Sequence, residues 1–170
     1  MKAPHDKDRD LLNLTEAELE ANLQPRGCPQ RPRPNEQQAL DFLLAGEGAV
    51  LEALRAQLAD ARVSIRHLSN AGFFVDFESP PAQLTLPGKP SFRLHDVYAE
   101  IRGLQYGMGL ILFVKDGLAD QLEGFPYAEE LPADWEIESM TYSDRACSTD
   151  PPITRPADAP HVGPGPSHPR

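Results

Sequence analysis

The dipeptide Asp116-Gly117 is the sequence feature that most constrains the fold of this chain. A two-residue hairpin turn of type I′ needs positive φ at both central residues, and Asp-Gly tolerates that conformation. The turn follows the run 110–114, which is apolar on both faces and therefore predicts a central strand. A return strand is expected over residues 118–124. The centre of the fold is thus predicted to be an antiparallel hairpin.

Alternation of apolar and polar residues predicts further strands on both sides of this hairpin. Residues 62–67 and 73–77 alternate around a turn at 69–72, and residues 92–103 and 136–142 predict two more strands. Before residue 62 the period is helical, which predicts one helix from an N-cap at Asn35 and a second over 49–61. The expected fold class is α+β, with two N-terminal helices packed on an antiparallel sheet of five or six strands.

Composition divides the chain into three parts. Residues 1–34 are expected to hold a short amphipathic helix over 11–23 and a linker rich in Pro and Arg, and residues 35–142 a single α+β domain. Residues 143–170 contain seven prolines and few apolar residues, so we expect a disordered tail and flexible ends. Whether Cys28 and Cys147, one in each flanking part, form a disulfide stays open. The chain shows neither a membrane-spanning run nor a secretory signal, so a soluble cytoplasmic protein is expected.

The net charge of −10 is concentrated in one stretch of the sequence. Residues 116–138 carry eight carboxylates and no Lys, Arg or His, whereas acids and bases nearly balance elsewhere. A local field of one sign attracts basic partners and repels nucleic acid and anionic membranes. We therefore expect a basic protein partner, and neither nucleic acid nor a membrane.

The sequence contains no recognisable catalytic, cofactor or metal motif. The histidines lack zinc-ligand spacing, and the carboxylates of the acidic stretch lack the spacing of a calcium-binding loop. Ser91, His95 and Asp96 lie near one another in sequence, but no Gly-x-Ser-x-Gly segment accompanies them, so a catalytic triad is not supported. No cofactor is expected, and whether the chain is an enzyme stays open, with a non-enzymatic role favoured. The alternative is a small ligand-binding domain or hydrolase with a pocket near His67 and His95, lined also by Tyr98 and Tyr106.

Aromatic residues interleaved with carboxylates favour a protein-binding surface in the acidic stretch. Aromatic side chains supply buried area in interfaces, and charges supply association rate and partner choice. The other interpretation is an acidic surface that only keeps the protein soluble. The candidate partner-binding residues are Glu123, Phe125, Tyr127, Glu129, Glu130, Asp134 and Trp135.

Two segments carry a resemblance. Residues 72–77 read Gly-Phe-Phe-Val-Asp-Phe, and residues 112–125 read Leu-Phe-Val-x-Asp-Gly-x-x-x-x-Leu-Glu-Gly-Phe. Together they resemble a group of small, largely uncharacterised bacterial α+β proteins. The resemblance implies a single cytoplasmic domain with the Asp-Gly hairpin at its centre. The expected function is that of a non-enzymatic bacterial binding protein whose acidic face docks a basic partner, as in immunity and antitoxin proteins.

Overall fold

The computed structural model describes residues 30–143 and 152–162 of the 170-residue chain. The expected helix over 11–23 and both cysteines lie outside the described residues. The elements in chain order are the helices α2 (Pro34–Leu43) and α3 (Ala49–Leu58), the strands β1 (Val63–Ser69) and β2 (Gly72–Phe77), the short 3₁₀ helix η3 (Ala82–Leu84), and the strands β3 (Phe92–Ile101), β4 (Met108–Lys115), β5 (Leu118–Pro126), β6 (Ile137–Ser143) and β7 (His161–Val162).

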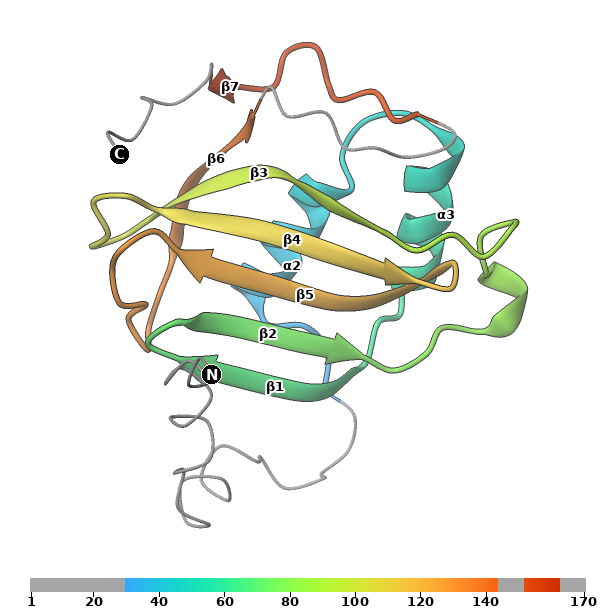
Figure 1. The fold of residues 1–170 in the computed structure, drawn as a ribbon, viewed down its shortest axis with the longest axis horizontal. Coiled ribbons are helices and arrows are strands. Elements are labelled where there is room, and N and C mark those ends of the chain that lie inside the picture. Colours follow the sequence, from blue (N-terminus) through green and yellow to red (C-terminus); the bar gives the residue numbers. More distant parts are fainter. Residues whose placement is uncertain (1–29, 144–151, 163–170) are drawn as a thin grey trace, which may run out of the picture.

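Figure 1 shows the strands as one sheet with α2 and α3 behind it. The strand order is β1-β2-β5-β4-β3-β6-β7. All neighbouring pairs from β1 to β6 are antiparallel, and the two-residue β7 lies parallel to β6. The predicted α+β class, with two helices and a sheet of antiparallel strands, is confirmed. The predicted central strand is also confirmed, because β4 is the middle strand of the seven.

The central hairpin forms at the predicted dipeptide. Lys115 pairs with Leu118, so the loop consists of Asp116 and Gly117, with φ angles of 49° and 80°. The buried side chain of Gln57 on α3 fastens this turn, because its Nε2 donates to the Gly117 carbonyl at 2.9 Å and its Oε1 accepts from the Ala119 N–H at 2.7 Å. The turn therefore joins β4 to β5 and is also fastened to α3.

One face of the sheet packs against both helices, and we call it the inner face. Alternate residues of β4 are fully buried there, including Leu110 and Leu112, beneath Leu40, Leu51 and Leu54 of the helices. The Phe73 ring of β2 stacks on Trp135 with ring centres 4.6 Å apart. The apolar residues that repeat every 3.6 positions on the helices and every second position on the strands pack together in this single core.

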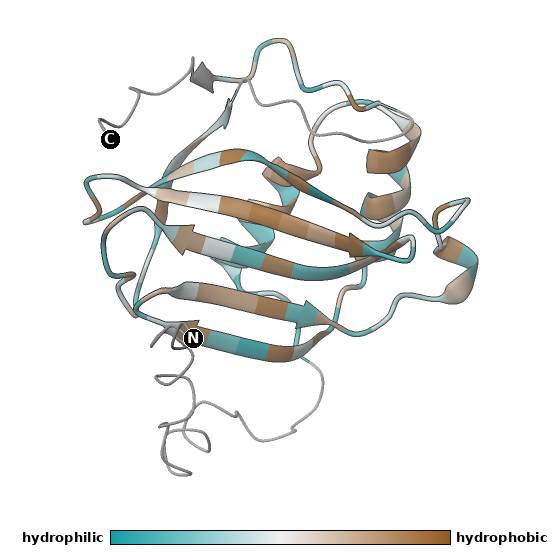
Figure 2. Cartoon of the chain, viewed as in Figure 1, coloured by the Kyte–Doolittle hydropathy of each residue, from teal (hydrophilic) through white to brown (hydrophobic). Residues whose placement is uncertain are grey.

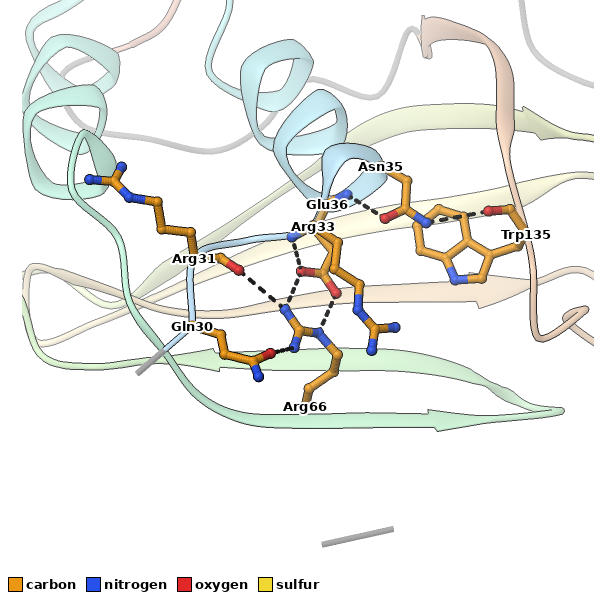
Figure 3. A network of polar contacts seen from close by, with 7 residues as sticks. All are labelled: Gln30, Arg31, Arg33, Asn35, Glu36, Arg66 and Trp135. Carbon is orange, nitrogen blue, oxygen red and sulfur yellow. Dashed lines mark hydrogen bonds and ion pairs between the residues drawn. The ribbon is translucent and has the colours of Figure 1, made fainter. Parts of the chain in front are cut away.

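The start of α2 differs from the prediction. The helix begins at Pro34, and the Arg33 N–H donates to the carboxylate of Glu36 at 2.7 Å, so Arg33 occupies the N-cap position instead of Asn35. Proline is favoured at the first helical position because it has no N–H to leave unpaired. Figure 3 shows that Asn35 instead donates to the Trp135 carbonyl, while Glu36 forms a buried ion pair with Arg66 of β1.

The C-terminal segment also differs from the prediction, since residues 152–162 lie against the domain. Arg155 pairs with Asp96 through two contacts of 2.8 and 2.7 Å, and both side chains are nearly buried. Its guanidinium also donates to the Leu43 carbonyl at the end of α2 and lies 4.7 Å from the centre of the Tyr142 ring. Ile153 and Ala159 also pack against the core, so this arginine and a few apolar contacts together hold a segment that was predicted to be disordered.

Candidate docking face

The side of the sheet that faces away from α2 and α3 is called the outer face. In the part of the chain that the structure describes, neither α-helix covers it (Figure 1). The strand registers and burial pattern place these side chains on it: Ile65, His67, Phe74, Asp76, Arg93, Tyr98, Ile111, Phe113, Gln121, Glu123 and Phe125. Figure 2 shows hydrophobic positions running along β4 in the middle of this sheet. Six of these eleven side chains are aromatic or aliphatic, whereas a solvated sheet face is normally polar.

An aromatic cluster occupies one end of the outer face. Tyr98 and Tyr127 lie with ring centres 6.2 Å apart. Phe125 and Tyr127 pack edge to face, with ring centres 5.3 Å apart. A Cβ added at Gly109 would lie 2.4 Å from the Phe125 ring and 2.7 Å from the Tyr127 hydroxyl. The rings of Phe125 and Tyr127 thus pack directly over the backbone of Gly109, and a larger residue at this position would displace the two rings.

Burial affects the protonation of this cluster. Desolvation raises the pKa of the Tyr98 hydroxyl, and the negative charge of Glu100 raises it further. The hydroxyl donates to the Tyr106 carbonyl at 3.2 Å. The Tyr98 hydroxyl is therefore protonated at physiological pH and available as a hydrogen-bond donor.

Glu123 lies at the centre of the outer face. Its neighbours across the sheet are Phe74 on β2 and Ile111 on β4. The side chain is partly buried, and none of the described residues forms a hydrogen bond or ion pair with it. Arg93 projects from the same face two strands away and makes no ion pair with it. A partly buried carboxylate between apolar neighbours is suited to accept charge-assisted hydrogen bonds from a cation that reaches it.

The other candidate carboxylates have different surroundings. Glu129 accepts the backbone N–H groups of Gln105 and Tyr106 at 3.0 and 2.6 Å, and therefore holds the loop between β3 and β4. Glu130 accepts from the Asn70 side chain at 3.3 Å. Asp134 is exposed in the loop before β6. The acidic stretch is thus divided between turns, loops and strands instead of forming one ridge.

Trp135 lies in the core and not on the surface. Only 6% of its surface is exposed, and its ring stacks on Phe73 of the inner face. The interpretation of Trp135 as a surface anchor for a partner is therefore corrected: in this structure the indole closes the domain's own core. The sequence signal was ambiguous, since a lone tryptophan suits a core and an interface equally.

The residues of the alternative pocket are not brought together. His67 lies on β1 and stacks on Phe74 at 4.9 Å, whereas His95 lies on β3, and three strands separate them. Of these four residues the structure joins only Tyr98 and Tyr106. Among the described residues no group of three or more His, Cys, Asp or Glu side chains could hold a metal ion.

The apolar neighbours of Glu123 could not be recognised from the acidic stretch alone. Phe74, Ile111 and Phe113 come from strands outside the acidic stretch, and the sheet order brings β2 and β4 to either side of β5. One signal could have found them, because a strand that is apolar on both faces needs a cover on both. The chain as described supplies only one.

No protein-family model, no curated protein and no solved structure matches this chain. No helix that the structure describes is long and apolar enough to cross a membrane. The described residues form an α+β domain in which α2 and α3 cover one face of the sheet and no helix covers the other.

Proposed function

We propose that this chain is a non-enzymatic binding protein whose outer face docks a basic protein, in the manner of immunity and antitoxin proteins. The observation that supports the proposal is the combination, on one uncovered sheet face, of an aromatic and aliphatic surface with Glu123 at its centre. Apolar side chains provide the buried area of an interface, and carboxylates select a partner of opposite charge.

The proposed docking surface includes only part of the acidic stretch, namely the residues that lie on or beside the outer face. Of the seven candidate residues, Glu123, Phe125 and Tyr127 lie on or beside the outer face, next to Phe74 and Ile111. Glu130 and Asp134 lie in the loop after β5, where their charges can steer a basic partner before contact. Glu129 supports that surface indirectly by holding the loop that carries Tyr106.

The test is capture of partners from lysate of the source organism on the immobilised full chain, followed by binding kinetics with each purified partner. Phe125→Ser should weaken binding mainly by faster dissociation, whereas Asp134→Asn should mainly slow association and reduce its salt dependence. Glu52→Gln is the matched control, because Glu52 is exposed on α3 behind the sheet.

The partner's own properties decide the outcome. The proposal predicts a partner of high isoelectric point that binds Glu52→Gln as well as the unchanged chain. A captured partner that is acidic, or that binds Phe125→Ser with unchanged kinetics, would contradict the proposal. Folding of Phe125→Ser is checked separately by its unfolding midpoint, so that loss of binding is not confused with loss of structure.

A further inference from the structure

The surroundings of Glu123 specify more than a basic partner. The Phe74 ring has His67 stacked against one side at 4.9 Å, and β5, which carries Glu123, lies on the other side. Cβ atoms of directly opposed residues in antiparallel strands lie about 4.5–5.5 Å apart. The carboxylate therefore has an aromatic ring on one side and the aliphatic Ile111 on the other.

A second carboxylate lies on the same surface. Asp76 pairs across the sheet with Gln121, two residues before Glu123, and receives a hydrogen bond of 2.6 Å from the Gln121 amide. Diagonal neighbours of this kind lie roughly 7–8 Å apart. Asp76 thus has a neutral donor and, among the described residues, no cation. Two carboxylates without a counter-ion share one apolar surface.

We propose that the position between Phe74, Ile111 and Glu123 receives a single arginine side chain of the partner. This inference rests on the proposed docking function and specifies the central contact of the docking surface. A guanidinium is planar, stacks on aromatic rings, and presents several N–H donors that suit a carboxylate through two parallel hydrogen bonds. It is also less strongly hydrated than the ammonium group of lysine, so it costs less to bring into a partly buried apolar site.

Charge also argues against a second copy of this chain as the occupant. A symmetric dimer apposes the same surface of both subunits. Pairing through the centre of the outer face would bring the Glu123 and Asp76 carboxylates of both copies together, while Arg93 of the same face lies two strands away from Glu123. The arginine of a different, basic chain removes this repulsion, and its neighbours must be apolar to cover Ile111 and Phe113.

The probe is a set of three synthetic peptides, Ac-Gly-Leu-X-Leu-Gly-NH₂, in which X is arginine, lysine or citrulline. Citrulline has nearly the shape of arginine without its charge. Each peptide is titrated into the isotope-labelled full chain while amide chemical shifts are followed by NMR. The arginine peptide should shift the amides of residues 74, 111 and 123, and should bind more tightly than the lysine peptide. The citrulline peptide should bind at least about tenfold more weakly, since hydrogen bonds to charged groups contribute about 1.5–3 kcal/mol.

Two Glu→Gln variants complete the test. Glu123→Gln should lose the preference for arginine over citrulline and retain its unfolding midpoint, whereas Glu52→Gln should keep the preference. Equal binding of all three peptides, shifts confined to other surfaces, no shifts at all, or dimerisation of the free chain through the outer face in sedimentation would each overturn the inference. The docking function is judged separately: a captured basic partner that is lost with Phe125→Ser but unaffected by Glu123→Gln sustains docking and overturns the arginine contact.

Discussion

The two faces of the sheet are made from alternate residues of the same strands, yet they differ in kind. On β4, Leu110 and Leu112 are fully buried against the helices, while Ile111 and Phe113, which alternate with them, are partly exposed. The inner face is closed by the chain's own helices. The outer face has no helix over it among the described residues, yet it carries apolar side chains such as Ile111 and Phe113, whereas a sheet face left to water is normally polar.

The difference also appears in how charge is treated. Beside the helices, the buried carboxylates Glu36 and Asp96 each have an arginine at 2.7 Å. On the outer face Glu123 has no such partner among the described residues. Compensated charge thus marks contacts that the chain makes within itself, and the proposed docking function assigns the uncompensated charge of Glu123 to contact with a partner. The comparison can be tested from both sides.

The largest expected effect comes from Trp135 on the inner side. Trp135→Ala should lower the free energy of unfolding by about 3–5 kcal/mol, because it leaves a cavity beside Phe73. Tyr127→Ala is the control, since Tyr127 is 40% exposed and its removal should cost about 1 kcal/mol or less. Urea unfolding measures both. An unchanged midpoint for Trp135→Ala would mean that the indole does not close the core.

Removal of a compensating arginine should cost nearly as much. Arg155→Ala should destabilise the chain by about 3–5 kcal/mol, because it leaves the buried Asp96 carboxylate without its cation. Arg102→Ala is the matched control: its pairs with Glu136 and Glu138 are exposed, and their loss should cost less than about 1 kcal/mol. Similar midpoints in urea for the two variants would show that residues 152–162 contribute little to the fold.

Much of the inner face could be predicted from the sequence, because its signals are local. The Asp116-Gly117 turn, the alternation of β3 and the apolar face of α3 each lie within a few residues. The position of Arg155 could not be predicted, because the contacts that hold it are made with Asp96 and with the Leu43 carbonyl at the end of α2. These residues lie 59 and 112 positions away in the sequence. A Pro-rich segment with few apolar residues gave no sign of such a contact.

Only those residues of the candidate site that are close together in the sequence could be predicted. Glu123, Phe125 and Tyr127 belong to β5 and the residue after it, and the sequence grouped them correctly with one another. Phe74 and Ile111 join them through strand order, which depends on which edges pair and is not encoded in any one segment. Trp135 was grouped with them by proximity in sequence, although the loop before β6 turns it to the inner face.

The two faces can be compared directly at neighbouring residues of β4. Leu112→Ala should cost about 2–5 kcal/mol, whereas Ile111→Ala, on the partly exposed outer face, should cost about 1 kcal/mol. Chemical unfolding of the two variants under identical conditions measures the difference. Equal costs would mean that the free chain already covers its outer face, and the docking surface would then have to lie elsewhere.

The central turn should show a smaller effect that is independent of either face. Gly117→Val places a β-branched residue at a φ of 80°, which costs about 1–2 kcal/mol, and its Cβ would also lie 2.9 Å from the Leu86 carbonyl. Gly88→Val separates the two causes, because Gly88 has a φ of 75° and open space around it. The thermal midpoint of Gly117→Val should be the lower of the two. The same midpoint in both would leave only backbone strain as the cause.

The smallest expected effect is a pH dependence from the aromatic cluster of the outer face. Burial, followed by the charge of Glu100, raises the pKa of Tyr98 above its ordinary value of 10.0. Above that pH the unfolded chain releases the phenolic proton while the native chain retains it, so the native state binds more protons and stability falls as pH rises. Urea midpoints between pH 8.5 and 11 should therefore decline, and Tyr98→Phe should reduce the decline. Burial also raises the pKa of Tyr142, although Arg155 opposes the shift, so part of the decline should remain in that variant. An identical decline in Tyr98→Phe would show that the outer-face cluster does not desolvate this hydroxyl.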